Sequence, residues 1–360
     1  MSKKIKVALV GVGNCSSFLV QAVEYYRSRE EKDIPGIMHV VLGGYKIEDI
    51  EFVAAFDVDK RKVGKDLSKA IFQEPNNAVR LAEVPKSGVR VEKGPVLDGI
   101  GDYLKKVVSI DPNQKPVDVA DVLKSSKAQV VVNYLPVGSY DATRYYAQEA
   151  LDSGCGFINA IPEFLASGEF ADKFEEKKLP ILGDDIKGQL GASILSRTLA
   201  RLFKDRGTAL DRMYQLNFGG NTDFLNLLEE SRLKYKRISK TETVQSVLEE
   251  KRLGEYNIKI GPSDYVPWLG TRKIAQMRFE GRSFGDINVQ LDVKLDVDDK
   301  SVSAGIMVDA IRCCRLALDR KIGGALVSPS SYFFKVPPVQ YPDYVAKEML
   351  EEFIQGKRER

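Results

Sequence analysis

The chain has 360 residues, of which 43% are hydrophobic and 29% charged, and its formal net charge is only +3. This length predicts about two domains, or one domain with a large insertion, and the interspersed signs of charge argue against a nucleic-acid or acidic-membrane partner. No stretch approaches the roughly 20 apolar residues of a membrane span, and the start lacks a secretory-signal pattern. The four cysteines show neither disulfide nor metal-ligand spacing, so we expect a cytoplasmic protein.

The first predicted element is a strand that runs through a glycine turn into a helix. The apolar run Ile5–Val10 precedes Gly11-Val12-Gly13-Asn14-Cys15-Ser16, and apolar residues then recur at helical spacing up to Tyr26. Gly11 would permit the tight turn. Gly13 would let a pyrophosphate approach the free N–H groups at the helix start, with Ser16 in place of the usual third glycine. This context favours dinucleotide binding over a plain turn.

An insertion over residues 27–51 precedes the second predicted strand, Glu51–Phe56. Asp57 follows that strand, where dinucleotide-binding folds place an acid against the adenosine ribose. We favour Asp57 over Asp59 for this contact. The acid also favours NAD over NADP, because it would repel a 2′-phosphate.

The insertion contains His39, the single histidine of the chain. We interpret it as a solvated or structural side chain, because its surroundings in the sequence offer no evident partner. Ser-His-Asp catalysis and His-rich metal sites are therefore disfavoured. Acid–base chemistry would have to use Lys, Asp, Glu or Tyr.

Helices and strands alternate after residues 61–116, which show no clear pattern. The expected elements are a helix over Asp118–Ser126, a strand over Gln129–Tyr134, a helix over Asp141–Leu151, a strand over Gly156–Ala160, a further helix, and a strand over Leu179–Gly183. This alternation predicts parallel strands joined by crossover helices, with ligands at the carboxyl ends of the strands. The residues that fall at those ends are Asn133, Gly138, Ser139, Asn159, Asp184 and Asp185.

The pattern changes after a helix predicted over Leu190–Phe203, with Ile194, Leu195, Thr198, Leu199, Leu202 and Phe203 on one stripe. Met213–Phe218 and Ile287–Val297 alternate apolar and polar residues, which is typical of antiparallel strands with one face open to water or a partner. A buried helix over Ser301–Leu318 follows. We therefore expect an α/β fold. A Rossmann-type parallel sheet domain, residues 1–205 and 301–360, would carry an inserted mixed α+β domain, residues 206–300, with an open-faced sheet for catalysis and oligomerisation.

Two lysines stand near the predicted start of a helix. Ser239-Lys240-Thr241-Glu242 is a capping box, so Lys240 falls in the first helical turn, where the dipole disfavours a cation. Lys236 adds a second charge just upstream. An anion such as phosphate between them would explain the arrangement, and so would two solvated lysines in a charged segment.

Three further charges lie among apolar residues. Lys273 shares a predicted strand face with Ala275, Met277 and Phe279, so it is either desolvated or reaches solvent at the strand end. Lys335 is a lone cation within Tyr332-Phe333-Phe334-Lys335-Val336-Pro337. Asp309 lies on the apolar face of its predicted helix, and a buried acid needs a cation or a ligand.

The ordered set of motifs resembles the myo-inositol-1-phosphate synthases of the shorter bacterial and archaeal branch over nearly the whole chain. The resemblance is carried by Gly11-Val12-Gly13-Asn14-Cys15-Ser16-Ser17, Phe157-Ile158-Asn159-Ala160-Ile161-Pro162, Gly183-Asp184-Asp185-Ile186-Lys187, Gln215-Leu216-Asn217-Phe218-Gly219-Gly220-Asn221 and Lys236-Arg237-Ile238-Ser239-Lys240.

The resemblance implies an NAD-dependent isomerase that converts glucose 6-phosphate to 1D-myo-inositol 3-phosphate. It oxidises C5, enolises the ketone, closes the ring by an intramolecular aldol step and reduces C5 again, with no net redox change. The resemblance also implies a homotetramer and, in many members, a metal ion near the nicotinamide and the phosphate, although no ligand cluster stands out here.

The implied active-site residues are Lys236, Lys240, Lys273, Lys335, Asp185, Asp309 and Asn217. Lys236 and Lys273 would act at the reacting oxygens and protons, Lys240 would hold phosphate and Lys335 would assist the redox step. The two acids would orient lysines. The residues expected to contact the cofactor are Gly11, Gly13, Asn14, Cys15, Ser16, Asp57, Asn133, Gly138, Ser139, Asn159 and Asp184.

Two alternatives remain open at this point. One is an NAD-dependent dehydrogenase with net hydride transfer on a small phosphorylated or carboxylated substrate. The other is a non-enzymatic NAD-binding regulator, which would not need lysines at apolar positions.

Overall fold

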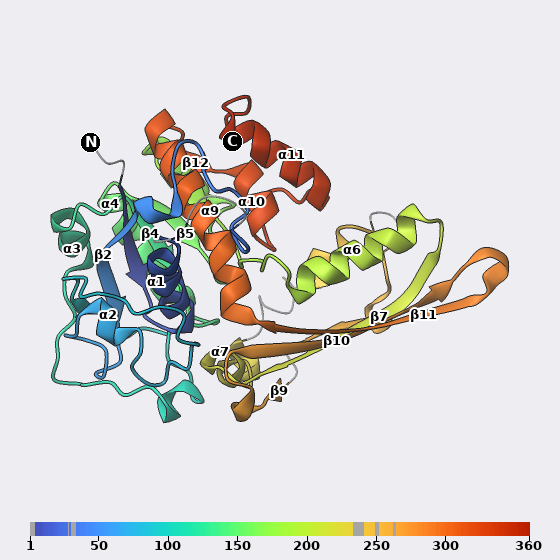
Figure 1. The fold of residues 1–360 in the computed structure, drawn as a ribbon, viewed down its shortest axis with the longest axis horizontal. Coiled ribbons are helices and arrows are strands. Elements are labelled where there is room, and N and C mark those ends of the chain that lie inside the picture. The colour runs from blue at the N-terminus through green and yellow to red at the C-terminus, as the bar shows by residue number, and fades with distance from the viewer. Residues whose placement is uncertain (1–3, 28, 30–33, 233–240, 249–251, 262–263) are drawn as a thin grey trace.

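A seven-stranded parallel sheet forms the body of the molecule (Figure 1). The structure is a computed structural model that describes residues 4–27, 29, 34–232, 241–248, 252–261 and 264–360. The strands are β1 Ile5–Val10, β2 Ile50–Asp57, β3 Val91–Lys93, β4 Val130–Asn133, β5 Gly156–Asn159, β6 Pro180–Leu182 and β12 Gly324–Ala325. Their order is β12-β6-β5-β4-β1-β2-β3, which confirms the predicted Rossmann-type sheet. Because β1 pairs with both β2 and β4, the order reverses beside it, where such sheets bind ligands.

Helices cover both faces of this sheet. They are α1 Asn14–Arg27, α2 Leu67–Ala70, α3 Val119–Ser125, α4 Tyr140–Asp152, α5 Glu169–Glu176, α9 Asp299–Arg320, α10 Val327–Phe333 and α11 Asp343–Ile354. Alternate residues of β1 serve two separate cores, because strand side chains point to opposite faces. Ile5 and Val7 pack with α1 and α9, whereas Ala8 and Val10 pack with α3 and α4.

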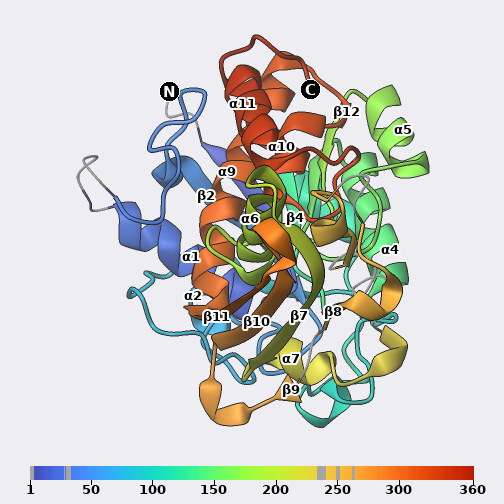
Figure 2. The same cartoon turned by 90° about the vertical axis from the view of Figure 1, so that its right-hand side faces the viewer.

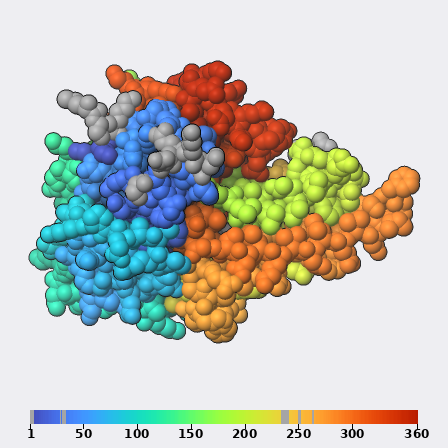
Figure 3. All heavy atoms as spheres, viewed as in Figure 1, coloured from blue at the N-terminus to red at the C-terminus, as the bar shows by residue number. Residues whose placement is uncertain are grey.

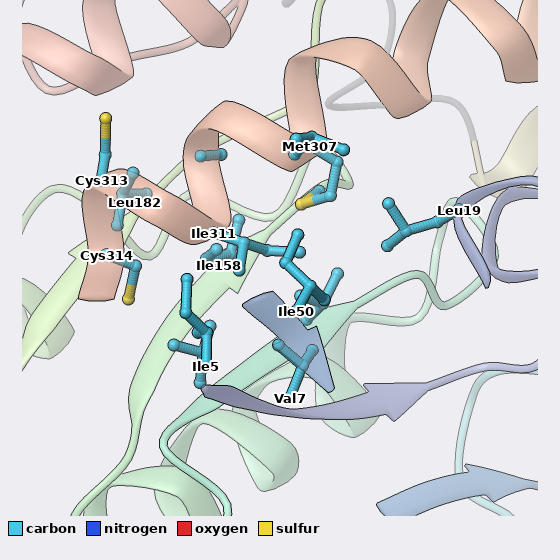
Figure 4. Close-up of a cluster of buried hydrophobic side chains, with 14 of the residues drawn as sticks. Ile5, Val7, Leu19, Ile50, Ile158, Leu182, Met307, Ile311, Cys313 and Cys314 are labelled. Atoms are coloured by element: carbon cyan, nitrogen blue, oxygen red, sulfur yellow. The ribbon is translucent and has the colours of Figure 1, made fainter. Parts of the chain in front are cut away.

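The long helix α9 anchors the C-terminal part of the chain to the first sheet. Met307 and Ile311 of α9 lie over Ile5 and Ile158 in one buried cluster (Figure 4). Each such fully buried aliphatic side chain contributes roughly 1.5–3 kcal/mol. The predicted helix over Ser301–Leu318 is therefore confirmed, although it begins two residues earlier, at Asp299.

A second, mixed sheet extends from the body. Its strands are β7 Ala209–Gly219, β8 Ile258–Ile260, β9 Asp264–Tyr265, β10 Arg272–Arg282 and β11 Asn288–Asp298. The order is β11-β10-β7-β8, with β9 also paired to β7. The helix α6, Ala192–Asp205, packs on one face, and the short helix α7, Thr222–Asn226, lies at the end near the body (Figures 1 and 2).

The other face of the second sheet is open. Side chains alternate along β11 between half-buried and exposed, as the sequence predicts. The exposed face includes Tyr214 and Leu216 of β7, which are 38% and 37% exposed. The hairpin of β10 and β11 projects beyond the body as an arm (Figure 3). The predicted open-faced sheet is thus confirmed, while the division into domains at residues 206 and 300 stays a prediction.

The helix α6 differs from its predicted pattern in one respect. Its buried side includes Ser196, Arg197 and Phe203, whereas Leu202 is 49% exposed. Arg197 is buried because its guanidinium donates to the Asp343 carboxylate and to backbone carbonyls, including that of Thr243. A polar side chain thus takes part of the face that an apolar stripe was expected to fill.

Within the described ranges, no helix has the length and apolar character needed to cross a bilayer.

His39 joins the insertion after α1 to the C-terminal helices. Its Nδ1 lies 2.5 Å from Asp309 Oδ2 and its Nε2 lies 3.0 Å from Glu351 Oε1. His39 is therefore a structural residue rather than a solvated one, which is one of the two interpretations given above. Because both ring nitrogens face carboxylate oxygens, only the imidazolium can donate to both. Burial alone would lower the pKa of His39, but Asp309 and Glu351 outweigh it and raise the pKa above the usual value.

This arrangement predicts a pH-dependent contribution to stability. A raised pKa in the folded state means that the contribution is complete below the unfolded pKa of about 6.5 and is lost as the pH rises through the folded pKa. We expect His39→Gln to lower the free energy of unfolding more at about pH 6 than at about pH 9. Urea unfolding at both pH values measures the difference. An equal loss at both would contradict a charged His39.

Candidate active site

The turn between β1 and α1 has the geometry of a nucleotide-binding turn. Gly11 has a φ of +87°, and a Cβ there would lie 2.9 Å from the Tyr134 carbonyl oxygen, so only glycine fits. A Cβ at Gly13 would meet nothing within 4 Å, which leaves open space above the turn. The Ser16 hydroxyl donates to the Gly11 carbonyl at 2.6 Å and closes the helix start onto the turn.

Asp57 supports this turn from the end of β2. Its Oδ2 accepts from the Val12 N–H at 2.8 Å, and its Oδ1 accepts from the N–H groups of Val58 and Asp59. The Lys62 ammonium lies 3.7 Å from Oδ2. The Asp59 carboxylate is instead paired with Arg61. Asp57 is thus the acid that contacts the glycine turn, and its contact with a ribose stays a prediction.

Two cavities meet at the turn. The larger encloses about 1300 Å³ of space open to solvent, and the smaller about 820 Å³. Gly13, Tyr134, Leu135 and Pro136 line both of them. The smaller cavity extends to Asp57, so the two together form one trough across the carboxyl ends of β1 and β2.

The trough suits a dinucleotide. The Tyr134 hydroxyl is buried and has no hydrogen-bond partner among the described residues, although a buried hydroxyl normally has one. Tyr134 is one of the residues that line both cavities. Together with the open space above Gly13, this unsatisfied hydroxyl indicates that a polar ligand belongs in the trough.

The larger cavity also collects lysines and acids from five parts of the chain. Its described charged lining residues are Lys273, Lys300, Lys335, Asp185, Asp223 and Asp299. Lys273 Nζ lies 3.1 Å from Asp299 Oδ1, and Lys300 Nζ lies 3.3 Å from Asp299 Oδ2. Burial alone would raise the pKa of Asp299, but Lys273, Lys300 and Lys335 outweigh it and lower the pKa below its usual range. Asp299 is therefore a carboxylate that holds two ammonium groups.

A second ion pair joins Lys335 to Asp185. Lys335 Nζ lies 2.8 Å from Asp185 Oδ1, and the Lys335 N–H donates to the Asp185 carbonyl at 2.7 Å. Asp185 has a φ of +58°, a conformation that is uncommon for residues other than glycine and that often marks functional positions. The predicted residues Lys273, Lys335 and Asp185 thus share one cavity, within reach of the glycine turn.

Several predicted cofactor contacts face the protein interior. The Asn133 side chain donates to Asn159 Oδ1 at 2.9 Å, and the Asn159 side chain donates to Asp184 Oδ1 at 2.7 Å. Ser139 donates to the Pro136 carbonyl, and Arg232 covers Gly138. Asn133 and Asn159 end β4 and β5, Asp184 follows β6, and Gly138 and Ser139 lie directly before α4, but none of the five lines either cavity in the described structure. Their role as cofactor contacts stays a prediction.

Asn217 lies one strand away from the ion pairs. It is fully buried on β7, where it accepts from the Gln215 side chain at 2.9 Å and donates to the Gly261 carbonyl. Gln215, two residues earlier, lines the larger cavity. Lys236 and Lys240 lie outside the described residues, and the helical residues 241–245 begin directly after them.

Asp309 does not join the cavity. It is fully buried near the middle of α9, where its carboxylate is paired with Arg312 and with His39. The acid beside Lys273 is Asp299, which the sequence analysis missed. Lys273 pairs with Val297 in the β10–β11 ladder, so the residue two positions further on reaches the lysine. In principle, this register could be predicted from the alternation of apolar and polar residues along β10 and β11.

The described residues do not fit the metal ion that the resemblance implies. No group of three or more His, Cys, Asp and Glu side chains among them could hold an ion. Both oxygens of Asp299 and one of Asp185 already contact lysine ammonium groups. A divalent cation at this place would be repelled by those lysines.

Comparisons with known proteins agree with this geometry. The sequence model of the myo-inositol-1-phosphate synthase family matches residues 191–300. The inositol-3-phosphate synthase of Mycolicibacterium smegmatis is 52% identical over 358 residues, covering 98% of this chain and 98% of that protein. The enzyme of the same name from Mycobacterium tuberculosis is 51% identical over 357 residues, covering 99% and 97%.

A solved structure shows the same fold. The crystal structure of a myo-inositol-1-phosphate synthase-related protein from Thermotoga maritima matches with a TM-score of 0.80 at 25% identity, covering 98% of each chain. Near-complete coverage at about half identity, together with the shared fold, confirms the resemblance seen in the motifs. The chain belongs to the inositol-3-phosphate synthase family.

Proposed function

We propose that this chain converts glucose 6-phosphate to 1D-myo-inositol 3-phosphate with NAD as a recycled cofactor. The observation that carries the proposal is the set of half-buried lysine–acid pairs in a cavity that continues into a nucleotide-binding turn. Cations in such surroundings suit a substrate that brings a phosphate and develops negative charge on its oxygens. The family membership supports the same activity.

The NAD would lie in the trough across the glycine turn. Gly13 would allow the diphosphate to approach the start of α1, and the trough beside Asp57 would take the adenosine end. When bound, NAD would take up a hydride from the sugar and give it back at the end of the reaction. The net redox state is then unchanged, which distinguishes this enzyme from an ordinary dehydrogenase.

The lysines would handle the charge that develops between those two hydride transfers. Lys273, oriented by Asp299, would donate to the reacting oxygen and exchange its proton, and Lys335, oriented by Asp185, would act near the redox centre. Lys236 and Lys240 would complete the site, with Lys240 on the substrate phosphate. These roles extend the resemblance to residues that the structure brings together, and Asp299 takes the orienting role first expected of Asp309.

Two further properties follow from the same proposal. The open face of the second sheet, with Tyr214 and Leu216 exposed, offers a surface for assembly into a homotetramer. All four cysteines are free, which suits a reducing compartment such as the cytoplasm.

The test is incubation of the purified protein with glucose 6-phosphate and NAD. We expect an inositol phosphate as the product, identified by chromatography and NMR, with no accumulation of NADH absorbance. Stoichiometric formation of NADH with an oxidised sugar would instead identify a net dehydrogenase. Binding of NAD without any turnover would favour the regulator.

A further inference from the structure

Lys300 is a buried lysine in the site that the sequence analysis did not single out. It is the second residue of α9, so its charge lies in the first turn of a long helix, where the dipole disfavours a cation. The residue is only 6% exposed, and burying an ammonium group is costly unless it is paired. A lysine in this position therefore calls for anionic partners.

The anionic partners within the described chain are shared with another cation. Lys300 Nζ contacts Asp299 Oδ2 at 3.3 Å, while Asp299 Oδ1 contacts Lys273. Asp223 lines the same cavity and adds a second, more distant carboxylate. Two ammonium groups thus divide one directly bonded carboxylate between them, which leaves capacity to bind a further anion.

The position of the ammonium group indicates which anion. Lys300 lines the same cavity as Gly13, Asn14 and Cys15, which lie at the start of α1. The N–H groups of such a helix start bind the diphosphate of a dinucleotide. The contact with Asp299 leaves N–H donors of the ammonium group for that ligand.

A second, independent observation indicates a missing ligand at the same place. The Tyr134 hydroxyl is buried, lies near Cys15, and has no hydrogen-bond partner in the ranges that the structure covers. Tyr134 lines the same cavity as Gly13 and Lys300, so a dinucleotide bound there would lie against this residue.

We propose that Lys300 binds the diphosphate of NAD and supplies there, as an ammonium group, the positive charge that a metal ion would otherwise provide. The inference rests on the proposed use of NAD. It also explains why the described residues do not fit a divalent ion. Lys300 and Lys273 occupy both oxygens of Asp299, a carboxylate that lines the same cavity as Gly13.

The first test measures binding without turnover. NADH fluorescence is titrated with the wild-type protein, Lys300→Met, Lys300→Arg and the control Lys347→Met, which removes the same charge from an exposed position on α11. We expect Lys300→Met to weaken NADH binding about tenfold to a hundredfold, because a charge-assisted hydrogen bond is lost. Lys300→Arg should stay within a few-fold of wild type, and the control should be unchanged.

Other outcomes of this titration overturn the proposal. If Lys300→Met binds NADH as wild type does but raises the KM for glucose 6-phosphate, Lys300 serves the substrate phosphate instead. Lys300→Gln, which keeps a donor toward Asp299 without the charge, provides a second variant if the methionine variant does not fold. A wild-type protein that binds no NADH would contradict the proposed function itself, which is a distinguishable failure.

The second test removes metal ions. The wild-type protein is dialysed against EDTA, its metal content is measured, and NADH affinity and turnover are determined before and after. We expect both to be unchanged. Loss of NADH affinity on removal of a bound divalent ion, with recovery when that ion is returned, would overturn the assignment of this charge to Lys300.

Discussion

Replacing Lys273 by alanine should lower the formation of inositol phosphate by at least about a thousandfold while NADH binding stays near the wild-type value. Removal of a positioned proton donor typically costs about 10²–10⁴ in rate, and loss of electrostatic stabilisation at a developing oxyanion costs a similar factor. Lys273 would supply both at the point where the larger cavity meets the ion pair with Asp299.

The geometry also explains why the effect should be confined to chemistry. Lys273 lies at the start of β10, in a ladder with β7 and β11, and it does not line the smaller cavity near Asp57. Its truncation therefore leaves the adenosine end of the trough intact. NADH fluorescence measures binding, and product analysis measures turnover in the same preparation.

Two further variants sharpen this prediction. Lys273→Arg keeps the charge but cannot give up a proton at neutral pH, so it should remain strongly impaired if proton transfer matters. Lys347→Ala, at an exposed position on α11, should turn over normally. Normal turnover in Lys273→Ala would rule out the assignment of this lysine to the active site.

The parallel sheet could be read from the sequence because its strands β1, β4, β5 and β6 are almost fully buried. Fully buried strands appear as continuous apolar runs between helical patterns, and their order of appearance predicts the fold class. Residues 61–116 gave no pattern because their elements are short. The helix α2 has four residues, and β3 has three. The Asp66 carboxylate holds this segment by accepting from the backbone of Ser68, Ser87 and Gly88 rather than through a periodic apolar face.

The site was only partly predictable from the sequence. The position of a residue in a predicted element fixes its place on the backbone but not the direction of its side chain. Asn159 and Asp184 lie at strand ends, as the rule for ligand sites requires, yet hydrogen bonds turn them toward each other and away from the trough. Lys273 was recognisable because it shares a strand face with buried Met277 and Phe279. Its partner Asp299 was not, since the pairing depends on the register of β10 against β11.

The resemblance places Asp309 in the active site, whereas the structure places it in a buried ion pair away from the cavity. A variant of Asp309 distinguishes these two placements. We expect Asp309→Ala to lower the free energy of unfolding by about 3–5 kcal/mol, because it leaves the fully buried Arg312 guanidinium without its carboxylate. The same change frees His39, which loses one of its two acids. Urea unfolding measures the loss.

The accompanying activity measurement decides between the two placements. Asp309 lines neither cavity, so the turnover number per folded molecule should change far less than in Lys273→Ala. Asp299→Asn provides the opposite control, since it removes the charge shared by Lys273 and Lys300 and should impair turnover strongly. A collapse of turnover in a stably folded Asp309→Ala protein would place this acid in the active site after all. A large loss of stability with turnover retained would mean that Asp309 holds α9 to the segment around His39 and takes no part in catalysis.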